Sequence, residues 1–334
     1  MKKFEPLITI DISVNASNEL ANNELCSHNF RNLKIISRNS TLALYQANEV
    51  KLRLCQLYPN ILIDVMGIST TGDHIVDRSL AAIGGKGLFT AELELALKDG
   101  LADLAVHSAK DLPASLPPEF TLSGFMERED SRDVFVANLY SGLNELPDGA
   151  IIGTASARRA MFIKKYYPHC HIKLLRGNIH TRLRKLDEGE YDGIILAAAG
   201  LHRLNLRGRI TEYLDPSKFI PAIAQGALAI EILADNHYLS EILDKLNHAD
   251  TDIAVKTERE VGRILQVGCS VPIAVHAWVK AETLYINSCL VDTCSGKTCQ
   301  FYGYSFRHEY LSLAAICADS LLSQGAYEIL KRYN

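Results

Sequence analysis

The side chains that could bind a ligand by charge are gathered in residues 151–210. This stretch holds twelve lysines and arginines against four acidic residues, although the whole chain of 334 residues has a formal net charge of −4. The stretch therefore carries +8 and the other 274 residues −12, an asymmetry that predicts an anionic ligand. Its basic residues are Arg158, Arg159, Lys164, Lys165, Lys173, Arg176, Arg182, Arg184, Lys185, Arg203, Arg207 and Arg209.

Polar residues recur directly after predicted strands, at the edge that lines the ligand crevice of an open α/β sheet. The helices that follow begin at this edge, and their free N–H groups and positive dipole ends favour an anion there. A single loop arginine is more often simply solvated. The same habit at five strand ends indicates a polyanion crevice, because a guanidinium fork matches a carboxylate or phosphate. These residues are Arg38, Ser40, Lys110, Asp111, Ser156, Arg158, Arg159, Arg176 and Arg203.

Two further patterns could indicate a nucleotide or a metal. GGKG at 84–87 lacks the G-x-x-x-x-G-K-[ST] spacing of a phosphate-binding loop, so nucleotide binding has little support. The eight cysteines include no C-x-x-C pair. The evenly spaced Cys289, Cys294 and Cys299 have no nearby histidine, which favours ordinary thiols over zinc. Thiols without a disulfide framework indicate a reducing, cytosolic compartment.

The elements that must position these residues alternate between strands and helices up to about residue 210. Apolar residues three and four apart from 43 to 57 predict a helix with Ser40 as its N-cap. Such alternation is typical of parallel sheets joined by right-handed crossovers. Strands are predicted at 33–37, 104–106, 151–154, 172–175 and 193–199, and helices at 43–57, at 88–98, after Ser156 and around Arg182.

The pattern changes from about residue 250. A helix is predicted at 250–265, with its apolar residues on one face, and alternating strands such as 273–278 follow it. A last helix is predicted at 311–330. This part of the chain is therefore expected to be a small α+β domain.

Composition excludes several classes of protein. The fractions of hydrophobic residues (48%) and charged residues (22%) are ordinary for a soluble globular chain, not a collagen-like or disordered one. No apolar run approaches 18 residues, so no transmembrane helix is expected. Residues 1–31 are too polar for a signal peptide and are expected to form a poorly ordered extension. The basic stretch lacks interleaved aromatic residues, so no nucleic-acid partner is expected.

Seven motifs, in this order along the chain, closely resemble those of the porphobilinogen deaminase (hydroxymethylbilane synthase) family. The resemblance runs from about residue 33 to the C-terminus, and only the N-terminal extension falls outside it. The motifs are RNSTLA at 38–43, GGKGLF at 84–89, HSAKD at 107–111, GTASARR at 153–159, LRGN at 175–178, PAIAQGA at 221–227 and GCSVP at 268–272.

The resemblance implies two lobes like those of periplasmic binding proteins, with the active site between them, and a third domain. By the motif, Cys269 of that domain holds a dipyrromethane cofactor through a thioether. A lone cysteine is by itself more often a buried apolar thiol. The implied parts are the extension 1–31, domain 1 at 32–126 and 227–247, domain 2 at 127–226 and domain 3 at 248–334.

The implied reaction joins four porphobilinogen molecules head to tail and releases four ammonia, giving linear hydroxymethylbilane for tetrapyrrole (haem) synthesis. Each pyrrole carries an acetate and a propionate, so the growing chain needs arginines to offset its charge. The resemblance implies a monomer without a metal. It places Lys110, Ser156, Arg158, Arg159, Arg182 and Gly200 on the cofactor, and Arg38, Ser40, Arg176, Arg203, Lys86 and Phe89 on the substrate.

Asp111 matches the catalytic aspartate of the family. Loss of ammonia requires protonation of the leaving amine, and a carboxyl group in the crevice can supply the proton and then stabilise the resulting cation. The residues alone leave open a purely structural pair with Lys110 or an arginine. A non-catalytic, two-lobed anion-binding protein is the alternative class, against which Asp111 and Cys269 count.

Two positions depart from the family: Val267 replaces a usual glycine, and Ala82 a frequent lysine.

Overall fold

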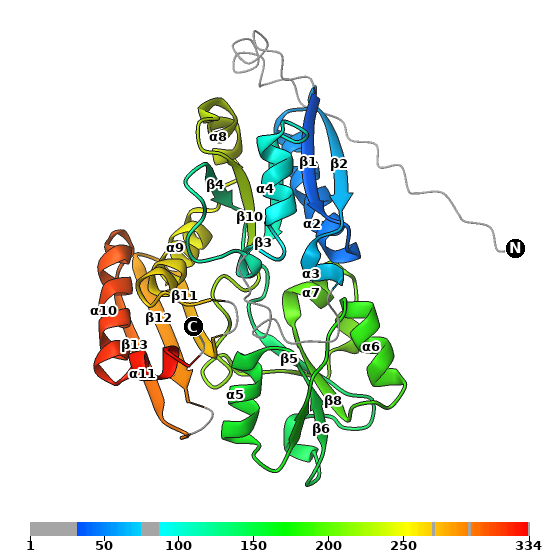
Figure 1. Ribbon diagram of the computed structural model, residues 1–334, viewed down its shortest axis with the longest axis vertical. Helices are drawn as coiled ribbons and strands as arrows, with labels where there is room; N and C mark the ends of the chain where they lie inside the picture. Colours follow the sequence, from blue (N-terminus) through cyan, green and yellow to red (C-terminus); the bar gives the residue numbers. More distant parts are fainter. Residues whose placement is uncertain (1–31, 75–86, 269–270, 293–294, 333–334) are drawn as a thin grey trace, which may run out of the picture.

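The computed structural model describes residues 32–74, 87–268, 271–292 and 295–332 of the chain. Two five-stranded sheets with helices packed on them form two lobes, and a three-stranded sheet with its own helices lies beside them (Figure 1). The predicted α/β fold of two lobes and a small α+β C-terminal domain is confirmed. None of the helices in the described part of the chain is both long and apolar enough to cross a membrane.

The first lobe is built on the sheet β2-β1-β3-β10-β4. Its elements are β1 (Asn32–Arg38), α2 (Thr41–Leu57), β2 (Leu62–Ile68), α3 (Thr71–His74), α4 (Ala91–Lys98), β3 (Leu104–Ser108), β4 (Phe120–Phe125), β10 (Leu228–Leu233) and α8 (His237–Asp244). β1 is parallel to β2 and β3, whereas β10 is antiparallel to β3 and β4. Four strands therefore run in one direction, and the strand that returns from the second lobe runs against them.

The second lobe repeats this plan in the sheet β7-β6-β8-β5-β9. Its elements are β5 (Asp133–Val136), β6 (Ile151–Gly153), α5 (Ala157–Tyr166), β7 (His171–Lys173), α6 (Ile179–Asp187), β8 (Gly193–Ala197), α7 (Ala198–Arg203) and β9 (Glu212–Tyr213). β6 is parallel to β7 and β8, and β5 is antiparallel to β8 and β9. The prediction of mainly parallel sheets holds for both lobes, with one reversed strand in each.

The third domain is an antiparallel sheet covered on one face by helices. Its elements are α9 (Ala249–Ile264), β11 (Ile273–Lys280), β12 (Thr283–Val291), β13 (Thr298–Phe306), α10 (Tyr310–Ser323) and α11 (Ala326–Leu330). One face of the sheet packs with α9 and α10 into a core. On the other face, Ala274, Cys289 and Val291 join the core of the second lobe. The sheet is therefore fixed to that lobe by apolar burial.

Three predicted elements differ from the structure. The single helix at 311–330 is two helices, because Gly325 takes the left-handed conformation (φ +94°) that ends α10. The strand at 193–199 stops at Ala197, where an alanine-rich segment begins α7; an apolar run does not distinguish a buried strand from a buried helix. The helix at 88–98 begins only at Ala91, because residues 87–90 form a turn.

A buried ion pair lies where the two segments that connect the lobes, 126–132 and 214–227, meet the third domain. Arg128 of the first segment places its Nη1 2.7 Å from Oε1 of Glu258, on α9. Its Nε donates to the carbonyl of Gln225 in the second segment (2.8 Å). One guanidinium group thus joins both connecting segments to α9.

The Glu258 carboxylate is fully buried and is shared by three parts of the molecule. Besides Arg128, it accepts hydrogen bonds from the backbone N–H groups of Ala224 (2.5 Å) and Ala277 (2.7 Å). Burial raises the pKa of Glu258 even though Arg128 faces it. Nη2 of Arg128 is a fourth donor, 3.2 Å from Oε2. The carboxylate is therefore costly to bury and is retained by these four donors.

We expect the variant Glu258→Ala to lower the free energy of unfolding by about 3–5 kcal/mol, because it leaves Arg128 buried without its partner. Glu260→Ala, on the same helix, is the control: its partner Arg263 is exposed (58%) and Glu260 itself is reached by solvent (20%), so its effect is expected below about 1 kcal/mol. Urea titration followed by circular dichroism measures both. Equal effects of the two variants would contradict the role assigned to the buried pair.

Candidate active site

Asp111 lies in a short 3-10 turn, Ala109–Asp111, directly after β3. The turn is pinned to the sheet, because Ala109 is buried and its N–H donates to the carbonyl of Ala227 (3.0 Å). Of the two polar residues that follow, Lys110 is mostly covered, whereas the side chain of Asp111 is 37% exposed. The apolar sequence of β3 therefore ends by presenting Lys110 and Asp111 at the edge of the first sheet.

Cations from both lobes approach the Asp111 carboxylate. Nη1 of Arg38, the last residue of β1, lies 3.9 Å from Oδ2 of Asp111. The charge of Asp111 also acts on Lys110 beside it and on Arg182 of α6, in the other lobe. Arg38 and Asp111, predicted at the ends of two different strands, are thus brought within 4 Å of each other.

Two of these cations are short of negative charge. Burial, followed by the charge of Arg159, lowers the pKa of Lys110 to about 8. The same two causes lower the pKa of Arg182 to about 10, and Arg176 adds to the repulsion. A base with a lowered pKa gains from any anion brought beside it. The arrangement therefore favours a ligand that carries several carboxylates or phosphates.

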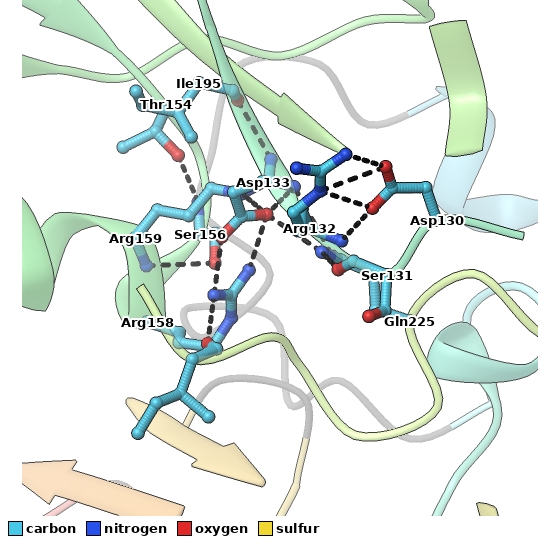
Figure 2. Close-up of polar contacts among 11 residues, drawn as sticks. Asp130, Ser131, Arg132, Asp133, Thr154, Ser156, Arg158, Arg159, Ile195 and Gln225 are labelled. Carbon is cyan, nitrogen blue, oxygen red and sulfur yellow. Dashed lines mark hydrogen bonds and ion pairs between the residues drawn. The ribbon is translucent and has the colours of Figure 1, made fainter. Parts of the chain in front are cut away.

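Asp133, at the start of β5, is the centre of a second cluster (Figure 2). Its carboxylate is fully buried and accepts hydrogen bonds from Arg158 Nη1 (2.6 Å), Arg159 Nε (3.0 Å) and Gln225 Nε2 (2.9 Å). Burial alone would raise the pKa of Asp133, but the two guanidinium groups outweigh it and hold this pKa below its usual range. The cluster is a buried unit that keeps one positive charge, because a single carboxylate faces two guanidinium groups.

Both arginines of this cluster are buried and bound inside the second lobe. Nη1 and Nη2 of Arg158 bind Asp133, and Nη1 also donates to the carbonyl of Ile220 (2.7 Å). Arg159 binds Asp133 through Nε and donates from Nη1 to the carbonyl of Ile195 (2.9 Å). The charges of both arginines act on Lys110, that of Arg159 more strongly.

Arg38 is held by an acid and an aromatic ring. It forms an ion pair with Asp73, which also accepts from the hydroxyl of Thr70 (2.8 Å). Its guanidinium carbon lies 4.2 Å from the centre of the Phe89 ring, a cation–π contact. Ser40 is the N-cap of α2, as predicted. Phe89 thus orients the arginine that faces Asp111.

Arg203 is the last residue of α7 and does not follow a strand directly, contrary to the prediction. Its Nε lies 3.2 Å from Oε2 of Glu49 on α2, so it reaches the first lobe. Gly200, on the same short helix, is buried, and a Cβ there would lie 2.7 Å from the side chain of Ile179. Glycine at 200 therefore lets α7 pack closely against α6.

Ser156 and Arg176 lie at the entrances of α5 and α6. The hydroxyl of Ser156 caps α5 by accepting from the N–H of Arg159 (3.4 Å). Asn178 caps α6 in the same way, and Arg176 lies two residues before it, half-buried. Both helices therefore begin at a polar cap beside a basic residue, Arg159 on α5 and Arg176 before α6.

Two of the predicted site residues, Lys86 and Cys269, lie outside the described residues, and so does Ala82. Val267, which precedes the Gly-Cys pair, packs against the core of the third domain and donates its N–H to the carbonyl of Gly262 (3.0 Å). The larger residue that departs from the family pattern is thereby accommodated in that core.

Cys289 and Cys299, the two thiols of the evenly spaced set that the structure describes, do not lie together. Cys289 faces the second lobe, whereas Cys299 on the neighbouring strand lies in the core on the opposite face of the sheet. Cys294 lies outside the described residues. Across the described segments, no group of three or more His, Cys, Asp or Glu residues is placed to hold a metal.

Sequence reasoning missed the acids that neutralise the arginines: Asp133, Asp73 and Glu49. Each lies far from its arginine in sequence or on another element, so no local spacing marks it. The sequence does contain a sign of Asp133, because this charged residue directly precedes the apolar run VFV and is the first residue of a buried strand. A buried acid is seldom left without a cation, and the basic stretch offered many.

Comparison with known proteins agrees with the motifs. The model of the "porphobilinogen deaminase, dipyromethane cofactor binding domain" matches residues 33–241, and that of the "porphobilinogen deaminase, C-terminal domain" matches 253–301. The porphobilinogen deaminase of Laribacter hongkongensis is 48% identical over 297 residues, which cover 89% of this chain and 96% of that protein. That of Neisseria meningitidis serogroup A is 51% identical over 303 residues, covering 90% and 97%.

Among solved structures, the periplasmic VFT2 domain of Bordetella pertussis BvgS has a TM-score of 0.41 at 16% identity, covering 68% of this chain and 91% of that one. A putative methionine-binding lipoprotein of Bacillus subtilis has a TM-score of 0.42 at 10% identity, covering 65% and 90%. The family models and the curated relatives span both lobes and the third domain, and the chain belongs to the porphobilinogen deaminase family.

Proposed function

We propose that the chain is a transferase that joins four porphobilinogen molecules into hydroxymethylbilane, with Asp111 as the catalytic residue and Cys269 as the cofactor attachment point. The observation that supports the role of Asp111 is the Arg38 guanidinium 3.9 Å from its carboxylate, with Lys110 in the same turn and with the charge of Asp111 acting on Arg182 of the other lobe. Cys269 is assigned by its match to the family motif. A pyrrole that bears two carboxylates would neutralise these cations while its amine lies beside the acid.

The residues of the crevice fit a dipyrromethane. Its acetate and propionate groups match Lys110 and Arg182, whose lowered pKa values mark a shortage of anions. Arg159 adds charge from α5, the hydroxyl of Ser156 lies at the start of the same helix, and Gly200 leaves room for close packing of α7. When bound through Cys269, the cofactor supplies the ring to which the first substrate is added.

Asp111 supplies the proton that the leaving amine needs. As the carbon–nitrogen bond of the substrate breaks, the carboxyl group of Asp111 gives its proton to the leaving amine, which departs as ammonia. The resulting carboxylate faces the positive charge left on the substrate ring and accepts from pyrrole N–H groups. Arg38, 3.9 Å away, holds this carboxylate in the crevice.

The remaining positions bind substrate and the growing chain. Arginine forks and a lysine offset carboxylates that would otherwise repel one another in a confined space. We assign Arg158 a positioning role, because its terminal nitrogens are bound to Asp133 and Ile220. The substrate-binding set is Arg38, Ser40, Lys86, Phe89, Arg176 and Arg203.

We propose domain 1 at 32–126 and 227–247, domain 2 at 127–226 and domain 3 at 248–334. The return of β10 to the first sheet supports the divided first domain. The protein acts as a monomer in the cytoplasm on a small-molecule substrate, without nucleic acid. The hydrophobic cores of the two lobes and of the third domain are formed within this one chain, which supports a monomer.

The covalent attachment is tested by the intact mass of purified protein. The wild type is expected to be heavier than its sequence by two linked pyrrole units, whereas Cys269→Ser has the mass of the sequence. Cys55→Ser, a half-buried thiol on α2, is the control and is expected to keep the added mass. Unmodified wild-type protein that releases no ammonia from porphobilinogen would overturn the proposed function.

The role of Asp111 is tested with Asp111→Asn, which keeps the shape and removes the acid. We expect the rate of ammonia release to fall by about 10²–10⁴-fold, with substrate binding retained. Asp244→Asn, at the end of α8, controls for the loss of one negative charge and is expected to leave the rate unchanged. If Asp111→Asn turned over at the wild-type rate, Asp111 would not be the acid.

The lowered pKa of Lys110 predicts a pH dependence of binding in protein without cofactor. The carboxylates of the ligand favour the protonated amine of Lys110. Above pH 8 most of this amine is neutral in the free protein, so binding must take up a proton. The affinity for porphobilinogen is therefore expected to fall about tenfold per pH unit above pH 8. Calorimetry of porphobilinogen with Cys269→Ser between pH 7 and 9.5 measures this. Adding Lys110→Arg, which keeps its charge throughout, is expected to flatten the profile; an equal slope in both proteins would contradict the role of Lys110.

A further inference from the structure

Arg203 forms an ion pair that joins the two lobes. It ends α7 of the second lobe, and its Nε lies 3.2 Å from Oε2 of Glu49 on α2 of the first lobe. α2 and α7 contact each other at this place (Figure 1). The pair therefore couples the faces that the two lobes turn toward each other.

The same guanidinium group also binds one of the segments that connect the lobes. Nη2 of Arg203 donates to the carbonyl of Gly226 (3.1 Å), and the N–H of Glu129, in the other connecting segment, donates to the same carbonyl (3.3 Å). Gly226 has φ +91°, and a Cβ there would lie 2.4 Å from the Glu129 carbonyl oxygen. Arg203 thus sits where both connecting segments and both lobes meet.

The two partners differ in their contact with water. The Arg203 side chain is 6% exposed, whereas that of Glu49 is 35% exposed and binds Arg203 through a single oxygen. By contrast, the Asp133 carboxylate is fully buried and held by Arg158, Arg159 and Gln225. A half-exposed carboxylate with one contact can be replaced by another carboxylate at little cost, because water solvates it as it leaves.

We propose that Glu49 is a positioning residue that latches the lobes together through Arg203 and is displaced when a substrate carboxylate takes its place. This inference rests on the proposed function, in which Arg203 binds substrate. The Glu49 carboxylate then competes with the substrate for one guanidinium group. Each displacement frees α2 from α7, so ligand binding loosens the contact between the lobes.

The test compares Glu49→Gln with Asp187→Asn in the cofactor-loaded enzyme. Glutamine keeps the size of the side chain and removes the competing charge, so KM for porphobilinogen is expected to fall about 3–10-fold with kcat within about twofold. Asp187 pairs with Arg209 inside the second lobe (2.6 Å), exposed to solvent, and its variant is expected to change neither constant. Glu49→Asp, which retains a carboxylate, is expected to return KM toward the wild-type value.

A second measurement does not depend on turnover. Hydrogen exchange of backbone amides in α7 is expected to be several-fold faster in substrate-free Glu49→Gln than in wild type, and unchanged in Asp187→Asn. An increased KM in Glu49→Gln would mean that Glu49 only orients Arg203, and unchanged KM with unchanged exchange would mean that no latch exists; either result overturns the proposal. Failure of the proposed function is separate, since it appears as wild-type protein without added mass or ammonia release.

Discussion

Mutual repulsion among the cations of the crevice is the constraint on which the structure depends. A surface rich in arginines must fold when no anion is bound, and like charges repel strongly in a space that excludes water. The chain meets this constraint with acids of its own: Asp133 for Arg158 and Arg159, Asp73 for Arg38, and Glu49 for Arg203. Burial and the charge of Arg159 lower the pKa values of Lys110 and Arg182, so each of these cations gains from an anion placed beside it.

Depth of burial separates the acids that are permanent from those that can be exchanged. Asp133 is fully buried, and its removal would strand two guanidinium groups in the interior, which is far more costly than the loss of a surface pair. Asp73 and Glu49 keep 27% and 35% of their side-chain surface exposed. The cluster at Asp133 therefore sets the shape of the second lobe, while the shallower acids lie on the surface that a polycarboxylate ligand would touch.

Features that depend on neighbouring residues could be predicted from the sequence, and features that depend on distant ones could not. The strand at 33–37, the Ser40 cap of α2 and the position of Asp111 after β3 all follow from local patterns. The reversal of β10 and the pairing of Asp133 with residues of α5 follow from tertiary packing, which leaves no local mark. Gly325 lies inside the apolar pattern of the predicted helix, but a single glycine only lowers the stability of a helix and does not by itself end one. The left-handed turn at Gly325 that divides α10 from α11 depends on the packing of both helices.

The position of Glu258 links the segments that connect the lobes to the helix before Cys269, the proposed attachment point. Glu258 lies on α9, whose chain continues through Val267 and Gly268 toward Cys269. Its largely buried ion pair with Arg128 fixes both connecting segments to α9, whereas the Glu49–Arg203 pair, whose carboxylate is 35% exposed, joins the lobes to each other. A buried pair without a replacement partner is much harder to separate than a solvated one. The connecting segments are therefore held to α9 more firmly than the two lobes are held to each other through Glu49.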